Sequence, residues 1–163
     1  MAVNLRYELE TAGWAHCTIE IDEQRAEITA SYLSDALGDL CAAVVALLRD
    51  DRSASATFAE ELGEFRWQFD VHDGDQLRVR IYWNEVEASW GEGLPDPSTP
   101  IFDGLCRLRT FAGQVVAELQ RLLREHGQTG YKERWVLNDF PTKRLEQLEA
   151  LLSDGAAGRP TSA

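Results

Sequence analysis

The residues best placed to do chemistry are three glutamates around a tryptophan near the middle of the chain. Glu85, Glu87 and Glu92 lie on either side of Trp90. Two carboxylates held together by a fold can serve as general acid and general base. The same group can bind a basic protein, because tryptophan is over-represented among the side chains that dominate interface energy. We predict that Glu85, Glu87, Trp90 and Glu92 bind a partner. The alternative is a solvated acidic loop whose tryptophan covers a sheet edge.

Other kinds of catalytic and metal chemistry find no support in the residue spacing. The chain has no Gly-x-Ser-x-Gly elbow for a nucleophilic serine. His16 and Cys17 are adjacent, but neighbouring residues of a strand point to opposite faces and cannot share a site. The other histidines, His72 and His126, are far apart, and there is no zinc, calcium or phosphate-loop motif. The sequence therefore predicts no catalytic residue, no metal and no cofactor.

The charge balance narrows the class of partner. The chain carries 16 basic and 28 acidic residues, which gives a net charge of −12. Nucleic-acid backbones and anionic membranes need a cationic face, so we expect neither as a partner. An acidic surface suits a basic protein partner, and it also serves solubility alone. The oligomeric state stays open.

Length and composition predict a single domain over residues 1–154, followed by a small polar tail, 155–163, that we expect to be disordered. The chain starts without a basic region followed by an apolar core. No run approaches the roughly 20 apolar residues of a membrane span. Cys17, Cys41 and Cys106 are odd in number and each lies in an apolar pattern, which indicates buried, reduced thiols. These features predict a cytoplasmic protein.

The clearest structural element is a β-hairpin over residues 64–83. Apolar and polar residues alternate along both arms, which is the pattern of strands with one buried face. A three-residue loop, His72-Asp73-Gly74, pairs Phe69 with Leu77 and Trp67 with Val79. It also places Gly74 at a left-handed position. The buried face is predicted to hold Phe65, Trp67, Phe69, Val71, Leu77, Val79, Ile81 and Trp83.

Further elements follow from the same patterns. Strands are expected at 3–10, 14–21, 24–30 and 54–60, with a short one at 101–105. Helical stripes predict helices at 33–48, 110–127 and 141–152, the first capped by Ser31 or Ser34, and a connector at 131–136. The fold class is therefore α+β, a mainly antiparallel sheet of about six strands with three helices packed on one face. We expect Trp67 and Phe69 to be buried against the first helix.

Several segments carry a resemblance to known proteins. They are Tyr32–Leu40, Glu64–Trp67, Gly130-Tyr131 with Trp135, and Phe140-Pro141. In outline the chain resembles small bacterial proteins of unknown function, and it is similar to immunity proteins of bacterial toxin systems. Those are small, acidic, α+β and free of catalytic motifs. The resemblance implies a toxin-neutralising binder and transfers no functional residue.

Two hypotheses of function remain. The first is a non-enzymatic binding protein that engages a basic protein partner through an acidic surface, such as a toxin-neutralising immunity factor. The alternative is a small-molecule-binding domain or an unrecognised enzyme, with a pocket between the sheet and the 84–100 loop. A concave cavity that holds two convergent carboxyls of perturbed pKa would favour the alternative.

Overall fold

A computed structural model of the protein describes residues 2–10, 12–61, 63–85 and 99–157. The elements, in chain order, are β1 (Val3–Leu9), β2 (Trp14–Ile21), β3 (Gln24–Ser31), α1 (Ala36–Leu48), β4 (Ser53–Ala59), β5 (Gly63–His72), β6 (Gln76–Glu85), β7 (Phe102–Arg107), α2 (Leu108–Trp135) and α3 (Thr142–Ala157). No helix in the described part of the chain is both long enough and apolar enough to span a membrane.

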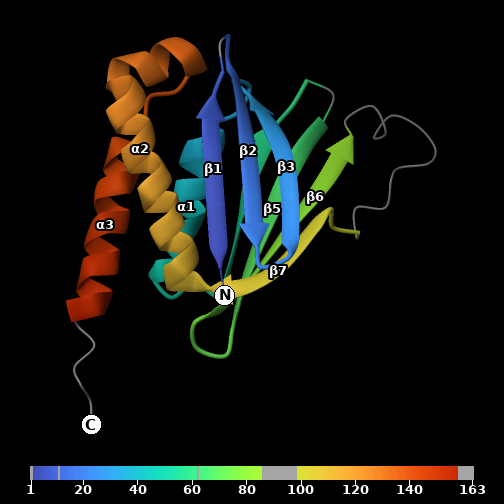
Figure 1. The fold of residues 1–163 in the computed structure, drawn as a ribbon, viewed down its shortest axis with the longest axis vertical. Coiled ribbons are helices and arrows are strands. Elements are labelled where there is room, and N and C mark those ends of the chain that lie inside the picture. Colours follow the sequence, from blue (N-terminus) through green and yellow to red (C-terminus); the bar gives the residue numbers. More distant parts are fainter. Residues whose placement is uncertain (1, 11, 62, 86–98, 158–163) are drawn as a thin grey trace.

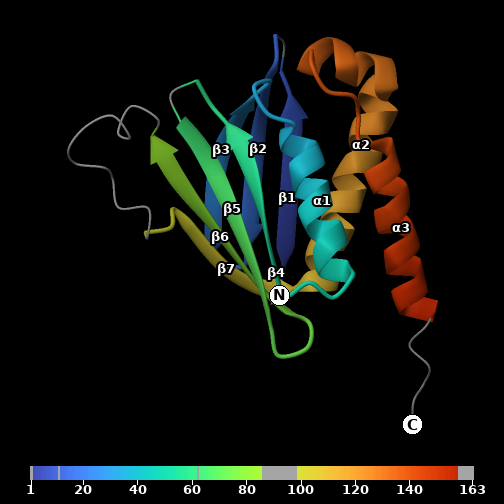
Figure 2. The ribbon, with the colours of Figure 1, turned by 180° about the vertical axis from the view of Figure 1, so that it is seen from behind.

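The seven strands of the described residues form two antiparallel sheets, one with the order β1-β2-β3 and one with the order β4-β5-β6-β7. The three-stranded sheet lies in front in Figure 1. Figure 2 shows the molecule from the opposite side, with the four-stranded sheet in front. The α+β class, the antiparallel pairing and the three helices are confirmed. The prediction of one sheet of about six strands is wrong, because alternation reveals which face of a strand is buried but not which strand lies beside it.

The inner faces of the two sheets meet in a common core. The rings of Tyr7 in β1 and Phe58 in β4 pack edge-on with centroids 6.1 Å apart. Trp67 and Phe69 of β5 are both fully buried, which confirms the predicted face, although α1, the helix expected to cover them, packs beside β4. Phe69 contacts Phe111 of α2, with ring centroids 5.6 Å apart. All three helices lie together on one side, with α2 beside β1 and α1 beside β4 (Figures 1 and 2).

Helix α2 seals the outer edge of β1 with side chains. The backbone N–H of Tyr7 donates to Glu118 Oε2 at 2.7 Å. Arg121 Nη2 donates to the Tyr7 carbonyl at 2.7 Å and to the same Glu118 oxygen at 2.9 Å. An edge strand exposes unpaired backbone groups that invite another strand. The glutamate–arginine pair therefore replaces a neighbouring strand at this position.

The loop between β3 and α1 seals the outer edge of β4 in the same way. Ser34 Oγ accepts from the N–H of Ala59 at 3.0 Å and donates to the Thr57 carbonyl at 3.3 Å. Ser31 Oγ donates to the Ala59 carbonyl at 2.9 Å. These bonds occupy the edge where β3 would have to pair with β4 to make one sheet. The serines predicted to cap α1 do this instead, and the side chain of Asp35 caps the helix by accepting from the N–H of Gly38 at 3.2 Å.

The hairpin of β5 and β6 has the predicted face but a different register. Phe69 pairs with Val79 and Trp67 pairs with Ile81, so the predicted partners, Leu77 and Val79, are wrong by two residues. The loop is Asp73-Gly74-Asp75, one residue further along than predicted, and Gly74 has a φ of 75°. Shifting the loop by one residue lengthens the ladder by one pair. Each side chain keeps its face because the shift between partners is even.

The late helices extend further than predicted. Helix α2 breaks at Gly127, where φ is 68° and ψ is 174°, and a second helical stretch continues to Trp135. The connector predicted at 131–136 is therefore mostly helical. Helix α3 runs to Ala157, three residues past the predicted end of the domain at 154.

Candidate functional site

Glu85 is the predicted partner-binding residue that the structure describes. It is the last residue of β6, it is exposed, and it pairs across the sheet with Gly63. Its Oε1 accepts from Trp83 Nε1 at 3.3 Å. The other three predicted residues, Glu87, Trp90 and Glu92, lie outside the described residues. The predicted pocket between the sheet and the 84–100 loop falls largely outside them too.

Three further glutamates lie at the same end of the four-stranded sheet as Glu85, and the register places the Glu64 side chain on the opposite face of the sheet from that of Glu85. Glu60 and Glu61 lie in the turn between β4 and β5, where the N–H of Glu60 donates to the Gly63 carbonyl at 2.8 Å. Glu64 follows that turn and pairs with the last residue of β4. We call Glu60, Glu61, Glu64 and Glu85 the acidic end. Sequence reasoning missed the first three residues, although the hairpin alternation already placed Glu64 near the end of β6.

The carboxylates of the acidic end lack basic partners. Among the described residues, no ion pair includes any of the four glutamates. Burial, and then the negative charge of Glu61, raise the pKa of Glu60. The backbone N–H of Glu61 opposes this shift because it stabilises the ionised form of Glu60. Other carboxylates without an ion pair in the described part of the chain, such as Asp22 and Glu23, lie elsewhere on the surface. The carboxylates that do form ion pairs among the described residues are Glu8, Glu20, Glu27, Asp70, Asp103, Glu118, Glu125 and Asp139.

Two exposed apolar side chains lie beside the acidic end. Tyr32 and Leu33 in the loop before α1 are 39% and 56% exposed. The loop is fixed to Ala59, the neighbour of Glu60, by the bonds from Ser31 and Ser34. Apolar side chains rimmed by charges are typical of protein interfaces.

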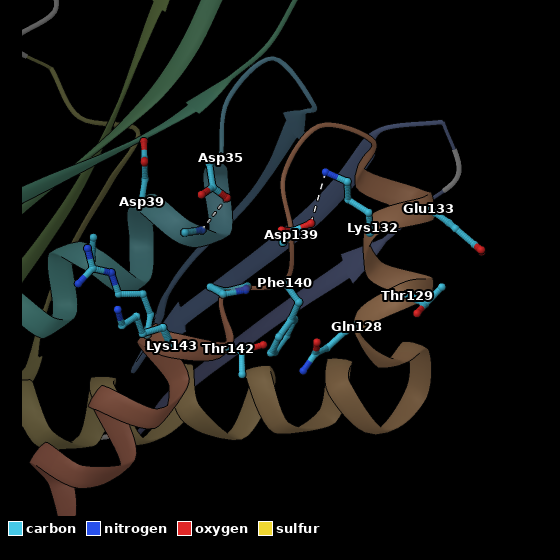
Figure 3. Close-up of a pocket in the computed structure, with 14 residues that line it drawn as sticks. Asp35, Asp39, Gln128, Thr129, Lys132, Glu133, Asp139, Phe140, Thr142 and Lys143 are labelled. Atoms are coloured by element: carbon cyan, nitrogen blue, oxygen red, sulfur yellow. Dashed lines mark hydrogen bonds and ion pairs between the residues drawn. The ribbon is translucent and has the colours of Figure 1, made fainter.

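A groove of about 800 Å³ opens between the three helices (Figure 3). Its charged lining residues have both signs, and Lys132 Nζ lies 3.4 Å from Asp139 Oδ1. Thr129, Thr142 and Gln128 add uncharged polar groups, and Phe140 adds an apolar wall. The charged residues are Asp35, Asp39, Lys132, Glu133, Asp139, Lys143 and Arg144.

The two aspartates of α1 in this groove each bond to the backbone. Burial, then the charge of Asp139, raises the pKa of Asp35, while the N–H of Gly38 opposes the shift. Burial and the charge of Asp35 raise the pKa of Asp39, while the N–H of Thr57 in β4 opposes it. Figure 3 shows the Asp39 carboxylate turned away from Thr142 and Lys143. The groove holds carboxyls of raised pKa, but these two do not converge on one point.

The thiols are buried and poorly reactive. Cys17, Cys41 and Cys106 are free and buried, as predicted. Burial raises the pKa of all three, that of Cys106 to about 12, so the reactive thiolate form is suppressed at neutral pH. Within the described ranges, no group of three or more histidine, cysteine or acidic residues is arranged to hold a metal ion.

Comparison with known proteins gives no relative from which a function could be transferred. No protein-family model, curated protein or solved structure matches the chain. What the protein binds is therefore inferred from the chemistry of its described surface.

Proposed function

We propose that the protein is a non-enzymatic binding protein whose acidic end engages a basic surface of a protein partner. A toxin-neutralising immunity factor is one protein of this kind. The observation that carries the proposal is the position of Glu60, Glu61, Glu64 and Glu85 at one end of the four-stranded sheet, without a basic partner among the described residues.

Electrostatics favours a cationic partner at this position. Like charges held together repel one another, and the charge of Glu61 adds to burial, the larger cause, in raising the pKa of Glu60. Lysine or arginine side chains of a partner would relieve that repulsion and would speed the encounter at low salt. Tyr32 and Leu33 supply exposed apolar area beside the charges. Burial of that area adds affinity that salt does not screen.

Capture of partners from the native host tests this proposal. The immobilised wild-type protein is expected to retain a basic protein at low salt and to release much of it at high salt. Glu60→Lys with Glu61→Lys should abolish the retention. Glu146→Lys with Asp154→Lys makes the same charge change at exposed positions of α3 and should leave it intact. Equal retention by both variants, or retention that salt does not affect, would contradict the proposal.

A second candidate function is binding of a small molecule in the groove between the helices. The observation that favours it is the groove of about 800 Å³, whose lining includes Asp35 and Asp39 with raised pKa values as well as Lys143 and Arg144. Such a lining suits a ligand with charges of both signs. A thermal-shift screen of zwitterionic metabolites tests it, because a ligand specific to the native state raises the unfolding temperature. No stabilising metabolite would count against this function.

A further inference from the structure

The strand β7 presents a free backbone edge. The N–H of Leu108 donates to the Asp75 carbonyl at 2.9 Å, and these two residues continue the β6–β7 register by one pair. Hydrogen-bonded pairs alternate along an antiparallel ladder. The backbone N–H and C=O groups of Asp103, Leu105 and Arg107 therefore point away from β6. The same rule turns Tyr7 of β1 outward, where α2 seals its edge.

Of the four edge strands, β1 and β4 are sealed by side chains, whereas β3 and β7 are not. Within the described part of the chain, no group bonds to the outward backbone of Asp103 or Leu105. Arg107 is the N-cap of α2, so its carbonyl accepts the first bond of that helix. The open edge of β3 bears Arg25, which is ion-paired with Glu20 and Glu27. Charges on an edge deter pairing with another strand. Strand β7 also bears an ion-paired charge, Asp103, but next to it the strand presents the apolar side chain of Leu105, which is 44% exposed.

A groove of about 910 Å³ runs along the free edge of β7. Arg78, Asp103 and Leu105 line it from the outer face of the sheet, and residues 21–24 line it from the turn between β2 and β3. That turn lies on the inner side, because a Cβ added to Gly104 would stand 3.1 Å from Ile21 Cβ. A groove lined from both sides of a sheet opens at the edge of that sheet. The free backbone of β7 is therefore accessible from the groove.

The wall on the turn side is acidic. Asp22 and Glu23 line it, and neither belongs to an ion pair among the described residues. Asp103 on the opposite side is neutralised by Arg78, whose Nε and Nη2 donate to its two carboxylate oxygens at 2.9 and 2.7 Å. The groove therefore favours cationic side chains on its turn side only.

We propose that the free edge of β7 docks an extended, basic segment of a partner protein, which adds to the four-stranded sheet as a fifth, antiparallel strand. Successive side chains of such a segment face opposite sides of the sheet. One set carries lysine or arginine towards Asp22 and Glu23, and the other set packs apolar side chains beside Leu105. This docking edge is separate from the acidic end and does not depend on the function proposed above.

Synthetic peptides test the docking edge without a known partner. The parent is a capped heptapeptide of alternating lysine and valine. In the proposed pose its valines lie beside Leu105, so the valine N–H groups face β7 and the lysine N–H groups face solvent. The parent should bind saturably and slow amide exchange at Asp103, Leu105 and Arg107. N-methylation of the valines should weaken binding at least about tenfold, because those hydrogen bonds are lost. N-methylation of the lysines should change the affinity little.

Charge variants separate this edge from the acidic end. Asp22→Asn with Glu23→Gln should weaken binding of the parent peptide, whereas Glu60→Gln with Glu61→Gln should leave it unchanged. The inference is overturned if the parent does not bind, if both N-methylated peptides bind equally well, or if the acidic-end variant alone loses binding. None of these results depends on whether the host partner is captured through the acidic end.

Discussion

Glu118 and Glu125 bind the same guanidinium, that of Arg121, but in different surroundings. Glu118 is 8% exposed and also accepts the backbone N–H of Tyr7. The side chain of Glu125 is 51% exposed and contacts Arg121 from one side at 2.7 Å. Solvent screens an exposed pair, whereas loss of one partner from a buried pair leaves an uncompensated charge. Their contributions to stability should therefore differ widely.

The matched variants Glu118→Ala and Glu125→Ala measure this difference. Glu118→Ala should lower the free energy of unfolding by about 3 kcal/mol, because it leaves the buried Tyr7 N–H without an acceptor and removes the buried carboxylate that pairs with Arg121. Glu125→Ala should lower it by less than about 0.5 kcal/mol. Urea denaturation gives both values. Similar losses for the two variants would mean that Glu118 does not seal the β1 edge.

Asp39 should make stability depend on pH in a defined direction. Folding raises its pKa above the ordinary value of 3.8, through burial and the charge of Asp35. The folded state therefore binds the proton more tightly than the unfolded state, so ionisation of Asp39 destabilises the fold. This cost is absent below pH 3.8, grows as pH rises through the raised pKa, and is complete above it.

Asp39→Asn removes that cost while keeping an oxygen acceptor for the Thr57 N–H. The variant should gain stability relative to wild type at pH 7, and the gain should shrink as the pH falls towards 3.8. Chemical denaturation across this range measures the difference. Asp154→Asn, at an exposed position of α3, controls for the change in net charge. A gain that is constant with pH would contradict the assigned cause of the shift.

At the scale of elements, the alternation of apolar and polar residues correctly predicted which face of each hairpin strand is buried. It did not predict which strands pair or in what register. The buried positions of β5 and β6 agree with the prediction because side-chain period and burial are directly linked. The two-sheet arrangement was missed because it depends on contacts between Ser31, Ser34 and Ala59, which are 25–28 residues apart in sequence. The predicted partners were wrong by two residues because the loops His72-Asp73-Gly74 and Asp73-Gly74-Asp75 keep every side chain on the same face.

The candidate site, too, could be predicted from the sequence only in part. Glu85 was recognised in the sequence because it lies in a local cluster of acids around Trp90. Glu60 and Glu61 join it only through the pairing of β4, β5 and β6, which local patterns do not reveal. The β7 edge was not predicted at all. Its openness is recognised only by comparison with the sealed edges of β1 and β4.

Gly104 tests how closely the two sheets pack. Its added Cβ would stand 3.1 Å from Ile21, so Gly104→Val should lower the free energy of unfolding by about 1–3 kcal/mol through overpacking. Gly113 in α2 has open space around it, and Gly113→Ala should raise stability by about 0.5–1 kcal/mol through helix propensity. Thermal denaturation of both variants gives the signs. A stabilising Gly104→Val would show that the sheets lie further apart at this point.

At the scale of the whole molecule, the net charge of −12 is unevenly compensated. Arginines neutralise carboxylates on the outer faces of both sheets and along α2, as in the pairs of Arg25, Arg80 and Arg121. The acidic end has no such compensation among the described residues. Solubility alone does not require unpaired acids to gather at one place, whereas recognition of a basic partner does.

Zero-length carbodiimide cross-linking of the captured complex tests the acidic end most directly, because this reagent joins a carboxylate to a lysine amine only when the two are in contact. After digestion, mass spectrometry identifies the coupled residues. We predict that lysines of the partner are joined to Glu60, Glu61, Glu64 or Glu85. Partner lysines joined instead to Glu146 or Glu149 of α3, or to acids on the sheet faces, with the acidic end unmodified, would contradict the account.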